Sequence, residues 1–367
     1  MNPQSRRTFL SSMAFGASMM TLPTFGAAAV HHTSQSRKLG VALVGLGNYS
    51  ENRLAPALQE TQHCELKGIV TGTPDKIGKW KDRYGIADKN VYSYETFDKI
   101  ADNKDIDVIY VVLPNSMHHE FVLRAARAGK HVICEKPVAV SVKEAEEMVA
   151  ACKKAGVRFF VGYRLHFEPF TQEAMRVGQQ KEFGKVKIVQ SEMGFRIGDP
   201  NQWRLKKDLA GGGAMMDVGI YAIQGARYSI GSEPVYVTAQ EYKTDKVKFR
   251  EVDETISWQM EFPDGEVAFC STTYASNIER LMISAENGWL ELRPAFGYGP
   301  IKGKTHKGEL TLPVVNHQAA QLDGMSLCIT AKKESSAEGE EGVRDMKVIE
   351  AIYQSIAAGG KRTPVPR

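Results

Sequence analysis

Short apolar runs alternate with longer amphipathic stretches between residues 39 and 161. The apolar runs predict strands at 39–44, 66–70, 107–112, 131–134 and 158–161. The stretches between them predict helices at 48–59, from Thr73 onward, at 116–128 and at 141–155. Strands that alternate with helices of this length are typical of a parallel sheet with right-handed crossovers. We therefore expect residues 39–162 to form a doubly wound α/β domain.

The pattern changes after Gly162. Strand-like runs follow one another at 186–192, 235–241, 255–262, 266–274, 281–285 and 289–292. Helices are predicted at 169–179, 214–228, 318–330 and 343–357, with a polar loop over 332–342. Consecutive strands without helices between them favour an antiparallel sheet. We expect residues 163–367 to form an α+β domain, an open, mostly antiparallel sheet with helices on one face, for substrate binding and oligomer contacts.

The first 29 residues resemble an export signal rather than part of a fold. Ser5-Arg6-Arg7-Thr8-Phe9-Leu10 is a twin-arginine pattern, followed by a moderately apolar stretch and by small residues at 26–29. The stretch is too polar and too broken for a membrane anchor. We expect a signal peptide over residues 1–29, a short arm over 30–38, passage through the twin-arginine (Tat) export machinery, and a periplasmic protein.

Composition narrows the functional classes. The 367 residues are 43% hydrophobic and 25% charged, which is typical of a globular chain of two domains. The net charge of +4 is scattered along the chain, so we expect no nucleic-acid partner. The five cysteines show neither the spacing of metal ligands nor the density of a disulfide framework. We expect buried thiols and no metal, and an oxidising compartment would permit one disulfide.

A glycine-rich turn follows the first predicted strand and opens the first predicted helix. It reads Gly45-Leu46-Gly47-Asn48-Tyr49-Ser50, the G-x-G-x-x-G pattern with serine in the third place. The first glycine permits the tight turn, and the second lets the backbone approach a pyrophosphate at the helix N-terminus. In this strand–turn–helix context the motif predicts a Rossmann dinucleotide site.

The end of the second predicted strand bears on the choice between NAD and NADP. NAD enzymes usually place an acidic residue there, against the ribose 2′-OH. Here Thr71 and Thr73 occupy the tip, and Lys76 follows where it can pair with a 2′-phosphate. We therefore favour NADP, and NAD stays open because Lys76 could instead be a solvated helix lysine.

Three separated residues suggest chemistry at a C–OH group. Lys136 follows a predicted strand within Glu135-Lys136-Pro137, at the sheet edge where a nicotinamide lies in this fold. Asp217 and Tyr221 are four residues apart on one predicted helix, so they share a face. A lysine, a carboxylate and a phenol together can move a hydroxyl proton while a hydride leaves carbon. Spacing leaves open whether the three meet, or form an ordinary ion pair and a core tyrosine.

Further motifs extend from Gly45 almost to Tyr353. They include Leu113-Pro114-Asn115-Ser116 with His118, Gly162-Tyr163-Arg164-Leu165-His166, Gln202-Trp203-Arg204-Leu205 and Asp217-Val218-Gly219-Ile220-Tyr221. In this order and spacing they resemble the Gfo/Idh/MocA family of oxidoreductases and, within it, the glucose–fructose oxidoreductases.

The resemblance implies site roles. Lys136 would act beside the nicotinamide, Asp217 would orient the sugar, and Tyr221 would be the acid/base. Together with the glycine motif, it places the cofactor against Gly45, Gly47, Asn48, Tyr49, Thr71, Thr73, Lys76, Leu113, Asn115, His118, Glu135, Lys136 and Tyr163. The sugar would contact Arg164, Trp203, Arg204 and Tyr298.

The resemblance also implies a cycle. An aldose would be oxidised at C1 to a lactone, and the same tightly bound NADP would then reduce a second sugar. Glucose–fructose oxidoreductases bury the cofactor with a longer arm that also reaches a neighbouring subunit. The arm at 30–38 is short, so permanent retention of the cofactor stays open. The oligomer stays open between dimer and tetramer, with an interface through the open sheet.

Three alternatives stay open. The first is a simple NAD(P)-dependent sugar or polyol dehydrogenase. The second is an NAD-dependent glycoside hydrolase of the same superfamily, against which the Glu135-Lys136-Pro137 motif argues. The third is a non-catalytic sugar binder, against which the intact Lys136, Asp217 and Tyr221 argue.

Overall fold

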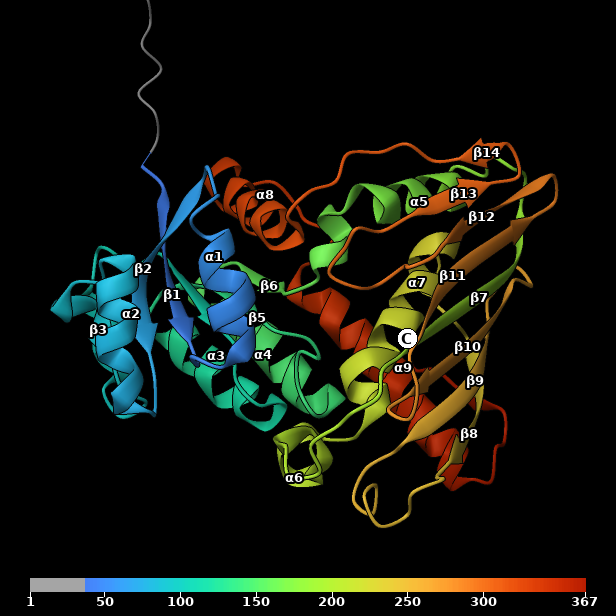
Figure 1. Ribbon diagram of the computed structural model, residues 1–367, viewed down its shortest axis with the longest axis horizontal. Helices are drawn as coiled ribbons and strands as arrows, with labels where there is room; N and C mark the ends of the chain where they lie inside the picture. The colour runs from blue at the N-terminus through green and yellow to red at the C-terminus, as the bar shows by residue number, and fades with distance from the viewer. Residues whose placement is uncertain (1–36) are drawn as a thin grey trace, which may run out of the picture. The chain divides into compact units, whose positions relative to one another are not determined.

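Six parallel strands form the first sheet of the computed structural model, which describes residues 37–367 (Figure 1). They are β1 Leu39–Val44, β2 Cys64–Val70, β3 Val91–Tyr92, β4 Val108–Val111, β5 His131–Cys134 and β6 Phe159–Val161. Their order is β3-β2-β1-β4-β5-β6, the doubly wound order in which a ligand crevice opens beside β1 and β4. The predicted Rossmann sheet is confirmed. The predicted signal peptide at 1–29 and arm residues 30–36 lie outside the described residues.

The helices of this domain follow its strands as expected. The chain after β1 forms a π-helical turn at Ser50–Leu54 and the short α1 Ala55–Ala57. The longer helices are α2 Ile77–Tyr84, α3 His118–Arg127 and α4 Val142–Ala155. The Ser141 hydroxyl caps α4 by accepting from the Glu144 amide, and Gly156 ends it at a φ of +69°.

Nine strands within residues 37–367 form the second sheet. They are β7 Val186–Gly194, β8 Tyr236–Tyr242, β9 Thr255–Glu261, β10 Val267–Thr273, β11 Ile278–Ala285, β12 Gly288–Leu292, β13 Gly303–Thr305, β14 Gly308–Glu309 and β15 Thr363–Pro364. Among these described strands only β7 and β10 pair in parallel, so the prediction of an open, mostly antiparallel sheet is confirmed. Alternating burial along β9 marks one buried and one half-exposed face.

In the part of the chain that the structure describes, helices cover one face of the second sheet. Figure 1 shows α5 Pro169–Gln179, α7 Ile220–Ile230 and α9 Gly339–Ala357 on the side toward the first domain. The remaining helices are α6 Lys207–Ala210 and α8 His317–Ala331. Helix α9 begins earlier than predicted, so the loop predicted at 332–342 ends before Gly339. Glu340 and Glu341 in its first turn favour this earlier start by complementing the helix dipole.

Contacts across the two domains fix the position of the crevice. The Asp323 carboxylate of α8 accepts the backbone amides of Gln62 at 2.9 Å and His63 at 2.8 Å. At the opposite edge, Phe160 of β6 forms a β-bridge with Glu338. These contacts hold residues 37–367 as one compact unit. The described helices include none with the length and apolar character needed to cross a bilayer.

Candidate active site

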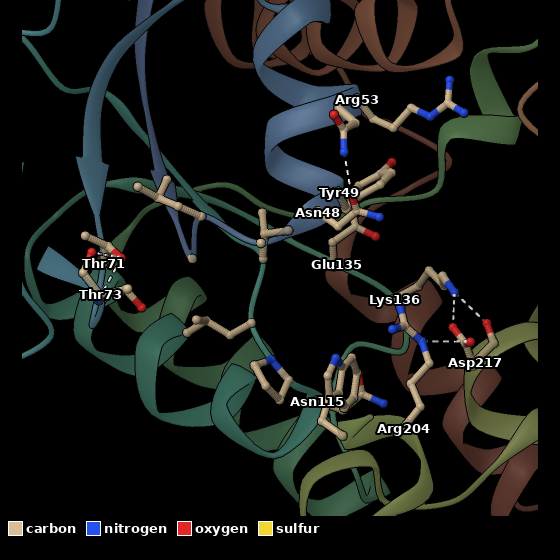
Figure 2. Close-up of a pocket in the computed structure, with 18 of the residues that line it drawn as sticks. Asn48, Tyr49, Arg53, Thr71, Thr73, Asn115, Glu135, Lys136, Arg204 and Asp217 are labelled. Carbon is tan, nitrogen blue, oxygen red and sulfur yellow. Dashed lines mark hydrogen bonds and ion pairs between the residues drawn. The ribbon is translucent and has the colours of Figure 1, made fainter. Parts of the chain in front are cut away.

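A cavity of about 690 Å³ opens at the carboxyl edge of the first sheet, beneath the helices of the second domain (Figure 2). Its lining is Gly45, Leu46, Gly47, Asn48, Tyr49, Asn52, Arg53, Thr71, Thr73, Lys76, Tyr94, Val112, Leu113, Pro114, Asn115, Glu135, Lys136, Trp203, Arg204, Asp217, Tyr221 and Tyr298. All three residues predicted to be catalytic are therefore on one cavity with most of the residues predicted to bind the cofactor or the sugar.

The glycine turn forms one end of the cavity. Gly45 has a φ of +95°, and a Cβ there would lie 2.3 Å from the Val112 carbonyl oxygen. A Cβ on Gly47 would meet no atom within 4 Å, so it would project into open space. The Ser50 hydroxyl donates to the Gly45 carbonyl at 2.6 Å and ties the helix start to the turn. An open backbone at a helix start suits a pyrophosphate, so a nicotinamide dinucleotide fits this cradle.

The tip of β2 carries no carboxylate toward the cavity among residues 37–367. Thr71 Oγ1 accepts the Thr73 amide at 3.0 Å, which shapes the turn (Figure 2). Lys76 reaches back across the turn, where its ammonium donates to the Leu46 carbonyl at 2.7 Å. The carboxylates that line the cavity, within the part of the chain described, are Glu135 and Asp217. The ammonium of Lys76 therefore stands beside the glycine turn against a carbonyl oxygen.

The opposite end of the cavity is organised around Asp217. Lys136 Nζ donates to Asp217 Oδ1 at 3.3 Å and also to the Asp217 main-chain oxygen (Figure 2). Arg204 Nε donates to Oδ2 at 2.9 Å, and the buried Tyr274 hydroxyl donates to the same oxygen at 3.0 Å. Lys136 Nζ lies 4.8 Å from the centre of the Tyr221 ring. Lysine, carboxylate and phenol therefore meet, as the resemblance implied.

Asp217 sits on a π-helical turn, Met215–Gly219, that precedes α7. Such turns widen the helix and are frequent at functional sites. Here the turn presents both the side chain and the main-chain carbonyl of Asp217 to one ammonium. Both carboxylate oxygens already accept from protein groups, so Asp217 mainly holds Lys136 and Arg204 in place.

The cluster shifts the titration of its members. Burial alone would raise the pKa of Asp217, but the charges of Arg204 and Lys136 outweigh it and lower the pKa to about 2. Burial alone would lower the pKa of Lys136, but Tyr221 and Asp217 raise it above its ordinary value. The pair is therefore a persistent carboxylate–ammonium pair.

Glu135 differs from its neighbour. Desolvation raises the pKa of this carboxyl, although the Tyr110 hydroxyl and the Lys136 ammonium oppose the shift. Tyr110 donates to Glu135 Oε1 at 2.6 Å and accepts from Gln321 Nε2 at 2.8 Å. Glu135 is thus held at the cavity wall by a chain of hydrogen bonds that reaches α8.

Three residues predicted to touch cofactor or sugar do not line the cavity. His118 is fully buried, with ring nitrogens 3.0 Å from the Pro137 carbonyl oxygen and 2.9 Å from that of Leu113, and burial lowers its pKa. Tyr163 is buried and donates to Asp345 Oδ2 of α9 at 2.6 Å. Arg164 is buried behind two cavity tyrosines. Each belongs to a motif singled out in the sequence, but the three side chains point into the protein rather than into the cavity.

Sequence reasoning missed several lining residues. They are Leu46, Asn52, Arg53, Tyr94, Val112 and Pro114. Asn52 and Arg53 lie four residues, one helical turn, after Asn48 and Tyr49. Residues at this spacing share a face of a helix, so the sequence could have predicted that they line the cavity. The Arg53 guanidinium carbon lies 4.5 Å from the centre of the Tyr298 ring, a contact between the two domains. Tyr274 was also missed, because no spacing links it to Asp217.

Replacing Asp217 with asparagine should make stability less dependent on acid. The folded pKa of about 2 lies below the ordinary value near ~3.9, so the stabilisation is complete above about pH 4 and is lost as pH falls toward 2. The difference in unfolding free energy between wild type and Asp217→Asn should therefore narrow by about 1 kcal/mol between pH 5 and pH 3. Urea denaturation at both pH values measures it. The exposed Asp208→Asn serves as control, and a gap that stays constant would contradict the ion-pair interpretation.

Comparison with known proteins identifies the family. A model described as "Oxidoreductase family, NAD-binding Rossmann fold" matches residues 39–163, and a GFO/IDH/MocA C-terminal domain model matches residues 171–291. The chain belongs to the GFO/IDH/MocA family. It is accordingly an NAD(P)-dependent oxidoreductase. The domain boundaries of 39–162 and 163–367 stay predictions.

Several solved and curated proteins are similar to most of this chain. The aldose–aldose oxidoreductase from Caulobacter crescentus, solved with glycerol, is 43% identical with a TM-score of 0.87, over 89% of this chain and 100% of that one. The "D-xylose 1-dehydrogenase [NADP(+)]" of Haloarcula marismortui is 26% identical over 334 residues, 88% of this chain and 92% of the relative. The "D-xylose 1-dehydrogenase (NADP(+)) 2" of Haloferax volcanii is 28% identical over 331 residues, 86% and 97%.

Proposed function

We propose that this protein is an exported NADP-dependent sugar oxidoreductase that oxidises an aldose at C1 to a lactone and reduces a second sugar with the same bound cofactor. The observation that carries the proposal is the meeting of Lys136, Asp217 and Tyr221 in the cavity that begins at the glycine turn. The aldose–aldose oxidoreductase of Caulobacter crescentus and the two NADP-dependent xylose dehydrogenases support a sugar substrate.

The residues of the chain would divide the work of the reaction. A bound nicotinamide supplies the hydride acceptor and, in the second half of the cycle, the hydride donor. Tyr221 would take the C1 hydroxyl proton as the C–H bond breaks and return it to the second sugar. Lys136 would hold that hydroxyl, and Asp217 would hold Lys136. Trp203, Arg204 and Tyr298 would shape the sugar site.

The cofactor preference rests on the tip of β2. The hydroxyls of Thr71 and Thr73 can donate hydrogen bonds to a ribose 2′-phosphate, and Lys76 can add a positive charge. Among the described residues that line the cavity near that tip, none is a carboxylate that would favour the free 2′-OH of NAD. NADP is therefore the proposed cofactor, held tightly between the two domains, and NAD is the alternative.

Native mass spectrometry of the purified protein, followed by sugar addition, tests the proposal. We expect a mass increment of one NADP(H) per chain and absorbance near ~340 nm after an aldose is added. A second sugar, ketose or aldose, should then remove that absorbance without release of the cofactor. Protein that arrives empty and never reduces added NADP would rule the proposal out.

Three further assays on the same purified protein separate the alternatives. A simple sugar or polyol dehydrogenase would release NADPH and need fresh NADP for each turnover. A glycoside hydrolase would release sugar from an aryl glycoside with no second substrate. A sugar binder would show a change in stability on sugar addition without any absorbance change.

Export is proposed from the N-terminal pattern alone. A protein that recycles its own cofactor does not depend on the cytoplasmic pool, which is consistent with periplasmic work. A fusion of residues 1–36 to a folded reporter should reach the periplasm. The double variant Arg6→Lys, Arg7→Lys of the fusion should not be exported. Equal export of both fusions would contradict passage through the twin-arginine machinery.

We also propose a homo-oligomer, a dimer or a tetramer, through the uncovered face of the second sheet. Phe269 on β10 and Ile188 on β7 are 47% and 42% exposed on that face. Phe269→Glu should place a charge in the interface and shift sedimentation toward the monomer. Val247→Glu, at an 82% exposed loop position, is the control and should leave the oligomer unchanged. An unchanged oligomer in Phe269→Glu would exclude this face.

A further inference from the structure

The rings of Tyr221 and Tyr298 both lie against one buried guanidinium. The Arg164 guanidinium carbon is 5.3 Å from the centre of the Tyr221 ring and 4.6 Å from that of Tyr298. Both tyrosines line the cavity, whereas Arg164 is only 2% exposed and does not. Arg164 therefore lies behind these two rings, outside the cavity lining formed by the described residues.

The other contacts of Arg164 anchor the loop that carries Tyr298. Nη1 donates to the Gly297 carbonyl at 2.9 Å and lies 2.9 Å from His317 Nδ1, while Nη2 donates to the Phe296 carbonyl. From the other side, Glu279 Oε1 accepts the amides of Phe296 and Gly297. Arg164 thus binds the carbonyl groups of Phe296 and Gly297, while Glu279 binds the amide groups of the same two residues.

Arg164 is also unusual in its charge balance. It takes part in none of the ion pairs formed by residues 37–367, and its Nε has no hydrogen-bond partner there. A buried cation without a carboxylate is unfavourable unless other groups replace its hydration. Carbonyl oxygens and the faces of two aromatic rings supply that replacement. The guanidinium is therefore held by the backbone and aromatic groups around it, which points to a role in placing those groups.

We propose that Arg164 is a positioning residue that fixes the Tyr221 phenol beside Lys136 and holds Tyr298 over the cavity. This inference rests on the proposed function, in which Tyr221 exchanges a proton with the sugar hydroxyl. The resemblance assigned Arg164 to the sugar pocket itself, and the structure places it one layer behind. Because a proton moves over a short distance only when donor and acceptor are aligned, small rotations of the phenol reduce turnover steeply.

Kinetics of Arg164→Met and Arg164→Lys test the proposal. Arg164→Met keeps the length of the side chain and removes the charge and the hydrogen bonds. We expect kcat to fall roughly 10- to 100-fold with the NADP(H) Kd unchanged. Arg164→Lys keeps the charge without the planar fork and should recover part of the loss. Arg176→Met, at an exposed ion pair on α5, is the control and should leave kcat unchanged. A wild-type kcat in Arg164→Met would overturn the proposal.

A readout without activity keeps the two hypotheses separate. Protein labelled with 3-fluorotyrosine gives ¹⁹F signals that Tyr221→Phe and Tyr298→Phe assign. In Arg164→Lys, and in Arg164→Met if it folds, both signals should shift or broaden, while that of Tyr242, exposed on β8, stays fixed. Unmoved Tyr221 and Tyr298 signals would overturn the positioning role. Wild-type protein that never oxidises an aldose would refute the proposed function, while the ¹⁹F result would still decide the role of Arg164.

Discussion

Lys136→Met is expected to abolish turnover in a protein that still folds and still binds its dinucleotide. Lys136 Nζ is the group that joins Asp217 to the face of the Tyr221 ring. Methionine fills similar space without the charge or the donor, so the hydroxyl of the substrate loses its partner. General acid–base groups contribute roughly 10²- to 10⁴-fold, and we expect a loss of that size in kcat. Steady-state kinetics with an aldose measure the change.

The matched control is Lys143→Met on α4. Its side chain is 86% exposed and makes a loose pair with Glu147, at 3.9 Å. It should keep wild-type kcat, KM and thermal midpoint. Lys136→Arg is a stricter comparison, because it keeps the charge but not the compact ammonium, and it should remain strongly impaired. Activity near wild type in Lys136→Met would remove the catalytic role proposed for this residue.

The parts of the fold predicted from sequence are those with a strong local signal. The periodicity marked every strand of four or more residues, and the 131–134 strand and the 169–179 helix have the same bounds in the structure. The strands that were missed, β3, β13, β14 and β15, have two or three residues each. Such short strands exist only because a neighbouring strand pairs with them, and no local pattern records that pairing.

The candidate site could be predicted from sequence only in part. The glycine turn could be located from Gly45 and Gly47, because backbone conformation limits which residues can stand there. The contact between Lys136 and Asp217 joins residues 81 apart in the chain, and it was expected only through the family resemblance. The hydrogen bond from Tyr274 to Asp217 had no signal of either kind.

Motifs also identified neighbourhoods better than they identified contacts. His118, Tyr163 and Arg164 all stand in recognisable motifs beside the cavity, yet each side chain points away from it. The direction in which a side chain points depends on the local backbone and on the buried groups that it contacts. Tyr163, for example, donates to Asp345, a residue of α9 far along the chain. A motif can thus mark the support of a site as readily as the site itself.

Gly45→Ala is expected to damage both stability and cofactor binding. A Cβ at Gly45 would lie 2.3 Å from the Val112 carbonyl oxygen and 2.8 Å from the Leu113 side chain, on a backbone with a φ of +95°. The Val112 oxygen belongs to the main chain just after β4, so the steric clash could be relieved only by a movement of the sheet edge. The left-handed conformation alone costs an L-residue about 1–2 kcal/mol, and the clash should bring the loss of unfolding free energy above about 3 kcal/mol.

Two other glycines separate the two effects. Gly85, at the end of α2, has a φ of +64°, and a Cβ there would meet no atom within 4 Å, so Gly85→Ala should lose only about 1–2 kcal/mol and bind NADP(H) normally. Gly47 is equally open but lines the cavity, so Gly47→Ala should keep its stability and weaken the dinucleotide at least about tenfold. Denaturant titration and NADPH fluorescence measure the two quantities in all three variants. If Gly47→Ala bound as tightly as wild type, the pyrophosphate could not lie over this turn, and the placement of the nicotinamide beside Lys136 would lose its support.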